Sequence, residues 1–210
     1  MTNRTTNKIK AIIFDFDGVI HDTFDINYRI NNIIHHHELP DISITEYKDM
    51  HDGNIYGHKR VTDEGTVRFF ELLAEEFKEL KIQEEIRTEL ELLKKRYDLF
   101  IISSNKEVIL NNYFSNNQAA HLFTHIFGLE THKSKLEKFG LMQKRYGLQK
   151  EECLFVTDTL GDLMEAKMAG VPSIAVNFGF HDAERLKKGK PLHIISQFSE
   201  LRKILEKIDE

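Results

Sequence analysis

Four short stretches of the chain place acidic, hydroxyl or lysine side chains directly after apolar runs. They are residues 14–19 (FDFDGV), 102–105 (ISSN), 132–135 (HKSK) and 156–162 (VTDTLGD). Phosphate-ester cleavage by an aspartate needs a carboxylate near phosphorus, a cation to offset charge and an acid for the leaving oxygen. One aspartate after a strand is commonly a turn or helix-cap residue, so the prediction depends on the ordered set. We expect the four stretches to form one phosphate-handling site.

The first stretch supplies two carboxylates with different tasks. Asp15 and Asp17 are two residues apart beyond an apolar run, so both can lie on the same side of the turn, and Gly18 relieves backbone crowding there. Asp15 can then attack phosphorus while Asp17 approaches the leaving group. This division requires Asp15 to stay ionised and Asp17 to have a raised pKa.

The later stretches supply groups for a phosphoryl oxygen and a metal ion. Ser104 and Asn105 precede an expected helix, whose N-terminal N–H groups can bind phosphate, although an ordinary helix cap is the alternative. Asp158 and Asp162 are four residues apart on one side of a turn, which suits a six-coordinate Mg²⁺. We expect Asp158 to bind the ion directly. Asp162 binds it directly, binds it through water, holds the lysine or caps the helix.

The elements that must position these groups alternate between strands and helices. Apolar runs predict strands at Ile9–Phe14, Leu99–Ile102, Leu122–Phe127, Leu154–Val156, Ser173–Val176 and His193–Ile195. Amphipathic segments predict helices at Lys106–Phe114, Ser134–Tyr146, Leu160–Ala169 and Glu200–Lys207. This alternation predicts an α/β fold with a doubly wound parallel sheet. Residues 22–95 show helical periodicity without a convincing strand, and an insertion there would stand over the carboxyl ends of the sheet.

Together the four stretches resemble the haloacid-dehalogenase-like hydrolase superfamily, in particular its capped, phosphoglycolate-phosphatase-like branch, over nearly the whole chain. The resemblance implies a Rossmann-type core at residues 1–20 and 96–210 and a small helical cap at 21–95. It implies that Asp15 is a nucleophile forming an aspartyl-phosphate, that Asp17 is the general acid and then base, and that the Asp17 carbonyl joins Asp15 and Asp158 around Mg²⁺. Dehalogenases of the superfamily lack the second aspartate, so Asp17 favours phosphoryl chemistry.

The catalytic lysine has two candidates. Many capped relatives have Lys-Pro-x-Pro here, whereas this chain has Lys133-Ser134-Lys135-Leu136 without either proline. If Ser134 caps the helix, Lys135 lies in the first turn, where the helix dipole disfavours a cation unless an anion compensates. We expect Lys135 to be catalytic, with Lys133 as the alternative and a solvated surface lysine as the ordinary role for either.

The expected cap carries the candidates for substrate specificity. Relatives place a loop that closes on the substrate in this region, and this loop contains Gly53, His58, Lys59 and Arg60. The alternative is a surface loop that joins two helices.

Composition limits the partners and the location. The formal charge of −5 argues against a nucleic-acid surface, and Cys153 is the only cysteine, so a disulfide framework is excluded. No apolar run approaches the ~20 residues that span a bilayer, and residues 1–10 contain no block typical of a signal peptide. We therefore expect a cytoplasmic protein without membrane or nucleic-acid partners, either monomer or homodimer.

These observations favour a Mg²⁺-dependent phosphomonoester hydrolase acting on a small phosphorylated metabolite. Two alternatives stay open. A phosphomutase resembling β-phosphoglucomutase would share the same Asp-x-Asp-Gly-Val sequence, and a non-catalytic phosphate-binding protein could retain the fold. Detection of a sugar bisphosphate intermediate would favour the mutase, and inactivity across a broad panel of phosphate esters would favour the binding protein.

Overall fold

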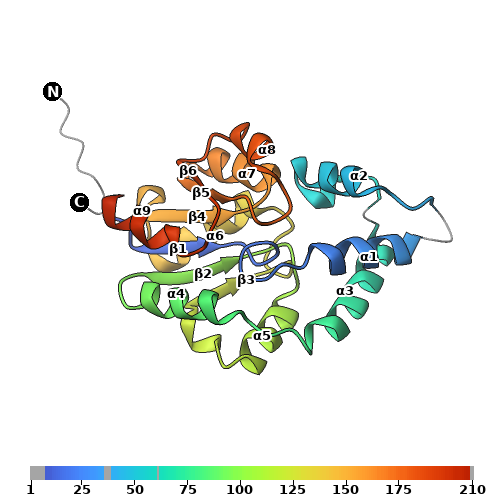
Figure 1. The fold of residues 1–210 in the computed structure, drawn as a ribbon, viewed down its shortest axis with the longest axis horizontal. Coiled ribbons are helices and arrows are strands. Elements are labelled where there is room, and N and C mark those ends of the chain that lie inside the picture. Colours follow the sequence, from blue (N-terminus) through green and yellow to red (C-terminus); the bar gives the residue numbers. More distant parts are fainter. Residues whose placement is uncertain (1–7, 36–38, 61, 209–210) are drawn as a thin grey trace.

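The computed structural model describes residues 8–35, 39–60 and 62–208. Its centre is a six-stranded parallel sheet with the strand order β3-β2-β1-β4-β5-β6 (Figure 1). The strands are β1 (Ala11–Phe14), β2 (Asp98–Ile102), β3 (His125–Phe127), β4 (Cys153–Thr157), β5 (Ser173–Val176) and β6 (His193–Ile195). The order runs outward in both directions from β1 and β4, so the predicted doubly wound α/β fold is confirmed.

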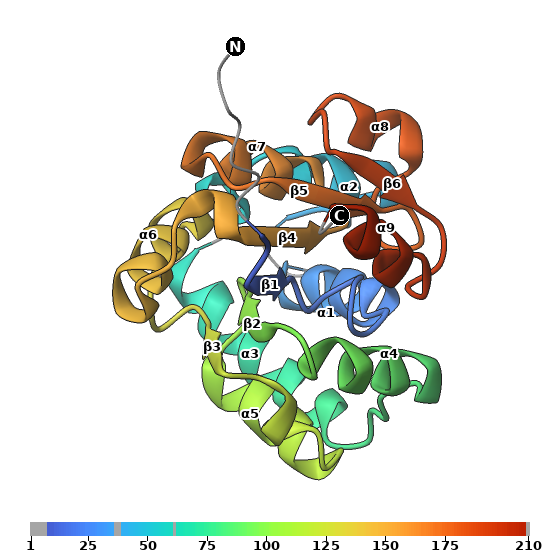
Figure 2. The same cartoon turned by 90° about the vertical axis from the view of Figure 1, so that its left-hand side faces the viewer.

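Side chains of the central strand alternate between two apolar layers. Ile12 and Phe14 pack in a cluster with residues of the helices α4 (Glu84–Lys94), α5 (Glu107–Asn116) and α9 (Glu200–Ile208). Ala11 and Ile13 face the opposite layer, formed by α6 (Lys135–Tyr146) and α7 (Leu160–Ala169). Figure 2 shows the sheet between α6 on one side and α4 and α9 on the other. Burial on both faces explains why these strands are continuous apolar runs.

The described residues of the segment after β1 form helices and 3₁₀ turns joined by loops, and none of its elements is a strand. It forms α1 (Phe24–His35), α2 (Ile44–Asp49), the 3₁₀ turns η1 (Met50–Asp52) and η2 (Ile55–Gly57), and α3 (Asp63–Phe77). Figure 1 shows α1, α2 and α3 beyond the ends of the strands that point toward them. We call this group, residues 24–77, the cap helices.

The helix α4 belongs structurally with the sheet, although the predicted cap range of 21–95 includes it. Ile86 and Leu90 are buried in the same apolar cluster as Leu99 of β2. The division into two domains stays a prediction, and this packing favours a cap that ends before α4.

The cap helices rest on the sheet domain through aromatic and ionic contacts. The ring of Phe180, which follows β5, meets Phe24 edge-on at 5.0 Å between centroids. Tyr47 of α2 lies in the same apolar cluster. Beside this cluster, Arg185 of α8 (Ala183–Lys187) pairs with Asp49 at 2.8 Å. These contacts place the cap helices directly over the strand ends.

Several element boundaries differ from the sequence prediction. The run predicted as a strand at Leu122–Phe127 begins instead with the 3₁₀ turn η3 (Ala120–Leu122), and a further 3₁₀ turn, η4 (Lys150–Glu152), leads into β4. The short helix α8 was not predicted, because five residues carry little periodicity. Ser134 precedes α6 as expected, but its hydroxyl donates to Glu165 (2.6 Å) and does not cap the helix.

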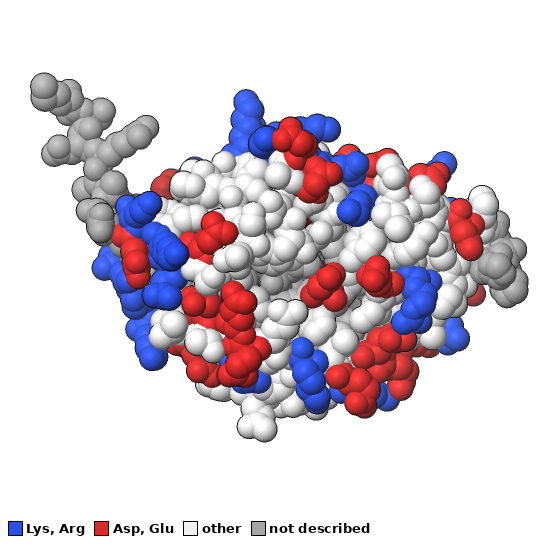
Figure 3. All heavy atoms as spheres, viewed as in Figure 1, with Lys and Arg blue, Asp and Glu red and all other residues white. Residues whose placement is uncertain are grey.

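Charges on the surface do not form a large patch of one sign in the view of Figure 3, where acidic and basic side chains are interspersed around a mostly uncharged centre. Among the described residues, no helix combines the length and apolar character needed to cross a membrane.

Candidate active site

The carboxyl ends of β1 and β4 lie side by side where the strand order reverses. Asp15 follows β1, and its backbone N–H donates to the carbonyl of Val156 in β4 (2.9 Å). Asp158 follows β4. Open α/β sheets bind ligands at such a switch point. A cleft of about 1010 Å³, including its solvent-open mouth, lies here beneath the cap helices, and both aspartates line it.

A buried lysine connects two carboxylates in this cleft. The Nζ atom of Lys135 lies 2.6 Å from Oδ2 of Asp15 and 2.6 Å from Oδ2 of Asp162. The Thr157 hydroxyl donates to the same Asp162 oxygen (2.8 Å). Burial opposes the charge of Lys135, but the two carboxylates together raise its pKa. Burial likewise opposes the charge of Asp162, yet Lys135 and these hydrogen bonds hold its pKa at about 2.

The other candidate lysine lies outside this cluster. Lys133 is largely exposed, pairs with Asp63 of α3 at 3.5 Å, and stands 5.7 Å from the centre of the Tyr56 ring. The difference follows from the helix start, because Lys135 is the first residue of α6 and Lys133 precedes it. Of the two candidates, the structure brings Lys135 to Asp15.

Asp17 has an environment suited to carrying a proton. Its Oδ1 accepts hydrogen bonds from the Thr23 hydroxyl (2.6 Å) and from the Asn27 amide (3.2 Å). Burial raises the pKa of Asp17 and outweighs these hydrogen bonds, which lower it. The direction agrees with the prediction of a raised pKa for a general acid.

The pKa of Asp15 differs from the expectation that this group stays ionised. Burial raises it well above the ordinary value, and Lys135 opposes the shift only in part, since that ammonium is shared with Asp162. A nucleophilic Asp15 therefore needs further positive charge in the cleft.

Gly18 allows the first and fourth stretches to approach each other. Its φ of +73° is in the left-handed region that favours glycine, and an added Cβ would stand 1.9 Å from Oδ2 of Asp158. A Cβ added to Gly179 would likewise stand 2.3 Å from the same oxygen. The backbone N–H of Phe180 donates to this oxygen (2.7 Å). The Asp158 carboxylate is thus fixed in position by backbone on two sides.

The other oxygen of Asp158, Oδ1, is buried and has no hydrogen-bond partner among the described atoms. Burial raises the pKa of Asp158 to about 8, against the effect of the Phe180 amide. When Asp15, Asp158 and Asp162 are ionised, their three negative charges meet one ammonium, that of Lys135. A divalent cation would neutralise the remainder and give Oδ1 a partner, so these oxygen donors fit a hard ion such as Mg²⁺.

Within residues 8–35, 39–60 and 62–208, no group of three His, Cys, Asp or Glu side chains is arranged to hold a metal unaided. The predicted metal site needs only two carboxylate side chains, those of Asp15 and Asp158, because Asp17 was expected to contribute its backbone carbonyl. The Asp162 carboxylate contacts Lys135 and Thr157. Of the roles considered for Asp162, these contacts favour that of holding the lysine.

Ser104 and Asn105 line the cleft from the loop after β2. The loop is held by the Asn105 N–H, which donates to the Ser103 hydroxyl (3.1 Å), and by the Tyr56 hydroxyl, which donates to the Ser104 carbonyl (2.6 Å). The Nδ2 of Asn105 is buried without a partner among the described atoms. The Asn105 amide also lowers the pKa of Asp17, so it faces that carboxylate, and it lies at the helix start where phosphate contacts were predicted.

The four specificity candidates of the cap separate into two groups. Gly53 and Arg60 line the cleft. The backbone of Gly53 also packs closely on Gly161, because a Cβ added to Gly161 would lie 2.4 Å from the Gly53 carbonyl oxygen. His58 and Lys59 are not among the residues that line it, and Lys59 is exposed.

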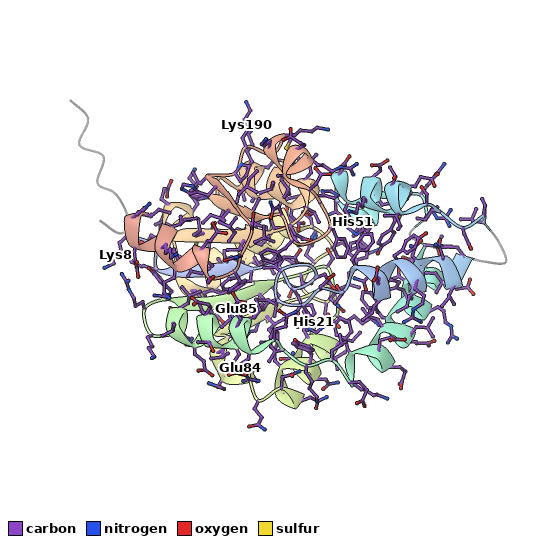
Figure 4. The ribbon with its side chains drawn as sticks, in the orientation of Figure 1. Lys8, His21, His51, Glu84, Glu85 and Lys190 are labelled. Carbon is purple, nitrogen blue, oxygen red and sulfur yellow. The ribbon has the colours of Figure 1, made fainter. Side chains whose placement is uncertain are left out.

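Several polar side chains at the site were not predicted. Lys138, fully buried, donates to the Ser103 carbonyl from beneath the loop after β2. His51 lies on the cap side of the strand ends (Figure 4), where burial lowers its pKa to about 4. Thr23 and Asn27 hold Asp17. Asn27 lies four residues after Thr23, one helical turn further on, and this spacing is the signal that could have identified the pair.

Comparison with known proteins identifies the class that this fold and site define. The model of the haloacid dehalogenase-like hydrolase family matches residues 12–176. The chain therefore belongs to this family of hydrolases.

Particular relatives include a 5'-nucleotidase of Pseudomonas aeruginosa, 31% identical over 101 residues, which are 48% of this chain and 45% of that protein. A phosphoglycolate phosphatase of Photorhabdus laumondii is 27% identical over 53% of this chain and 49% of its own length. The chain thus matches about half the length of each. A solved structure of a predicted phosphoglycolate phosphatase from Haemophilus somnus 129pt shares the fold, with a TM-score of 0.77, 19% identity and coverage of 93% and 97% of the two chains.

Proposed function

We propose that the protein is a Mg²⁺-dependent phosphomonoester hydrolase that acts on a small phosphorylated metabolite through an aspartyl-phosphate. The observation that carries this proposal is the contact of Lys135 with Asp15 at the switch point of the sheet, beside the unpaired oxygen of Asp158. A nucleophilic carboxylate, a fixed cation and a further place for a cation are the components that phosphoryl transfer to an aspartate requires.

In the first step, a carboxylate oxygen of Asp15 attacks phosphorus, and the bond between phosphorus and the ester oxygen breaks. The leaving oxygen takes the proton of Asp17, which burial keeps available by raising its pKa. Lys135, the Ser104 hydroxyl and the Asn105 side-chain amide stabilise the negative charge of the phosphoryl oxygens. The products of this step are a free alcohol and phosphorylated Asp15.

In the second step, ionised Asp17 takes a proton from water as the water oxygen attacks phosphorus. The bond between phosphorus and the Asp15 oxygen breaks, which releases inorganic phosphate and restores both carboxyl groups. The net reaction consumes one water molecule for each ester.

Asp15, Asp158 and the backbone carbonyl of Asp17 would hold the Mg²⁺ ion, whose charge offsets that of the phosphoryl group and the carboxylates. Asp162 would act by holding Lys135 in place. The cap helices would cover the cleft, so that water enters only after the alcohol leaves.

The test is phosphate release from a panel of phosphate monoesters with and without Mg²⁺. We expect Asp15→Asn to abolish turnover while the protein stays folded, because Lys135 keeps its contact with Asp162. The matched control is Asp25→Asn, an exposed aspartate at the start of α1, which should retain full activity. Phosphatase activity retained in Asp15→Asn would overturn the proposal, and an isomerised phosphate product would favour the mutase alternative.

A further inference from the structure

One face of α1 leads from the catalytic aspartates into the cap. Asn27, Asn31 and His35 are spaced by four residues, so they lie one above another on the helix, and all three line the cleft. Asn27 contacts Asp17, and His35 lies eight residues further, about 12 Å along the axis. We call the part of the cleft along this face the cap chamber.

The cap chamber contains buried polar atoms without partners among the described residues. They are Oδ1 of Asn27, Oδ1 of Asn31 and Nε of Arg60, on side chains that are 6%, 6% and 8% exposed. The orientation of the Asn27 amide is fixed, because its Nδ2 donates to Asp17 and to Thr23. Its Oδ1 is therefore a hydrogen-bond acceptor that lacks a donor. Such buried groups ordinarily have partners.

Arg60 lies at the far end of the chamber. Its Nη2 donates to the carbonyl of Pro40 (3.0 Å), and Asn32 of α1 bonds the backbone of Ile42 nearby (3.0 Å). These contacts place the guanidinium beside the C-terminal half of α1, away from Asp15. The unpaired Nε therefore offers a donor at the end of the chamber opposite the phosphoryl group.

The remaining wall of the chamber is apolar. Phe69, Phe70 and Leu73 of α3 line it, together with Ile34 of α1. The chamber thus combines two acceptors, one donor and aromatic surface. Hydroxyl groups donate and accept hydrogen bonds, and the C–H faces of a sugar or of a carbon chain pack on aromatic rings.

We propose that the cap chamber binds the leaving group of the substrate, and that this group is a hydroxyl-bearing ring or chain of sugar size or larger. Its hydroxyls donate to Asn27 and Asn31, and an oxygen at its far end accepts from Arg60. This inference rests on the proposed function and names its substrate class. Sugar phosphates, polyol phosphates and the ribose of nucleoside monophosphates share this chemistry.

The same features disfavour a short phosphorylated acid. A two-carbon leaving group cannot extend from the phosphoryl site to Arg60, given that the α1 face spans about 12 Å. Its carboxylate would also lie near the Asn27 and Asn31 oxygens, which are acceptors and repel a second acceptor.

The experiment compares kcat/KM for four kinds of substrate: p-nitrophenyl phosphate, phosphoglycolate, a set of sugar and polyol phosphates, and nucleoside 5'-monophosphates. The variants are Asn31→Leu and Arg60→Gln, and the matched control is Asn112→Leu, an exposed asparagine on α5. The leaving group of p-nitrophenyl phosphate has no donor for the Asn31 oxygen, so with Asn31→Leu this substrate reports the chemical centre and the folded state alone. Its nitro oxygens can accept from Arg60, so it is not a neutral reference for Arg60→Gln.

We expect kcat/KM to be highest for a hydroxyl-bearing substrate. For this substrate, each chamber variant should lower the value roughly tenfold, the loss of about one good hydrogen bond, mainly through KM. Asn31→Leu and the control Asn112→Leu should retain the wild-type rate with p-nitrophenyl phosphate. The relative rates of sugar, polyol and nucleotide substrates then distinguish the sources of the hydroxyl groups.

Two results would overturn the inference while leaving the proposed function intact. One is a preference for phosphoglycolate over every hydroxyl-bearing ester. The other is an equal loss for all substrates, p-nitrophenyl phosphate included, in an Asn31→Leu variant that melts like the wild type. Absence of any activity in the wild type with Mg²⁺ would instead contradict the proposed function.

Discussion

The ammonium of Lys135 lies 2.6 Å from a carboxylate oxygen of Asp15, and Lys135 as a residue is 2% exposed, so a buried cation is held by the residue that we propose as the nucleophile. Asp162 contacts the same ammonium from the other side. Breaking a buried ion pair by removing one partner is costly, because the remaining charge is left uncompensated. The three residues thus depend on one another for stability as well as for chemistry.

Lys135→Met tests this dependence. We expect the free energy of unfolding to fall by about 3–5 kcal/mol without added Mg²⁺, since two carboxylates lose their cation. We also expect kcat to fall at least ~100-fold with Mg²⁺, the size of effect seen when one oriented charge partner is removed. Urea unfolding and phosphate release measure the two effects.

Lys133→Met is the matched control, because this lysine lies two residues away on the surface. Its substitution should change the free energy of unfolding by about 0.5 kcal/mol or less. Equal effects of the two variants would mean that Lys135 has no special electrostatic role.

A second prediction concerns the proton on Asp17. Thr23→Val removes a hydrogen bond that lowers the pKa of Asp17, so the pKa should rise further. A general acid must be protonated, hence the alkaline limb of the pH dependence of kcat should move to higher pH. The pH–rate profile with p-nitrophenyl phosphate measures this shift. Thr88→Val, an exposed threonine on α4, should leave the profile unchanged, and a shift to lower pH in Thr23→Val would contradict the assignment of Asp17.

A third prediction compares two glycines with opposite surroundings. Gly18→Ala places a Cβ against Asp158 at a φ of +73°, and it should destabilise the protein by about 1–3 kcal/mol and disrupt the site. Gly140, inside α6, has no heavy atom within 4 Å of an added Cβ. Gly140→Ala should therefore stabilise the protein by about 0.5–1 kcal/mol through helix propensity, with unchanged activity. Thermal unfolding measures the change in stability of each variant. A change in the same direction for both variants would refute the explanation from backbone conformation and Cβ contacts.

Much of the fold could be predicted from the sequence, because strands buried on both faces are apolar runs that stand out from their surroundings. The strand ends then placed Asp15, Ser104 and Asp158 along one edge, and the structure brings them to one cleft. The end of the cap was harder to predict. The helix α4 has the same amphipathic pattern as a cap helix, and its packing against β2 distinguishes it.

The supporting polar residues could not be predicted, since their partners are distant in sequence. Lys138 lies in the first turn of α6, lysine side chains are ordinarily solvated, and its partner Ser103 lies 35 residues earlier. The choice between Lys133 and Lys135 likewise depended on the residue at which α6 begins. Asn31 became informative only when the burial of its Oδ1 without a partner was known. Arg60 was a specificity candidate in the sequence, and its unpaired Nε gave that candidate a specific contact.

A fourth prediction concerns Lys138 and the pH dependence of stability. Burial lowers the pKa of Lys138 to about 7, whereas an unfolded lysine titrates near its ordinary value of 10.5. Between these values the unfolded chain binds the additional proton, so the contribution of Lys138 to the free energy of unfolding should rise with pH from about 7 to about 10. Below pH 7 both states are protonated, and the cost of burying the charge is present in full.

Lys138→Met removes this titration and keeps an unbranched side chain of similar length. The difference in unfolding free energy between variant and wild type should therefore favour the variant most at pH 6–7 and shrink steadily toward pH 9.5. Urea unfolding at four pH values measures it, and Lys144→Met, on the exposed face of α6, is the matched control. A difference that is constant with pH would show that Lys138 keeps an ordinary pKa in the folded protein. Its contact with the Ser103 carbonyl would then hold a charged ammonium beneath the loop after β2 at neutral pH.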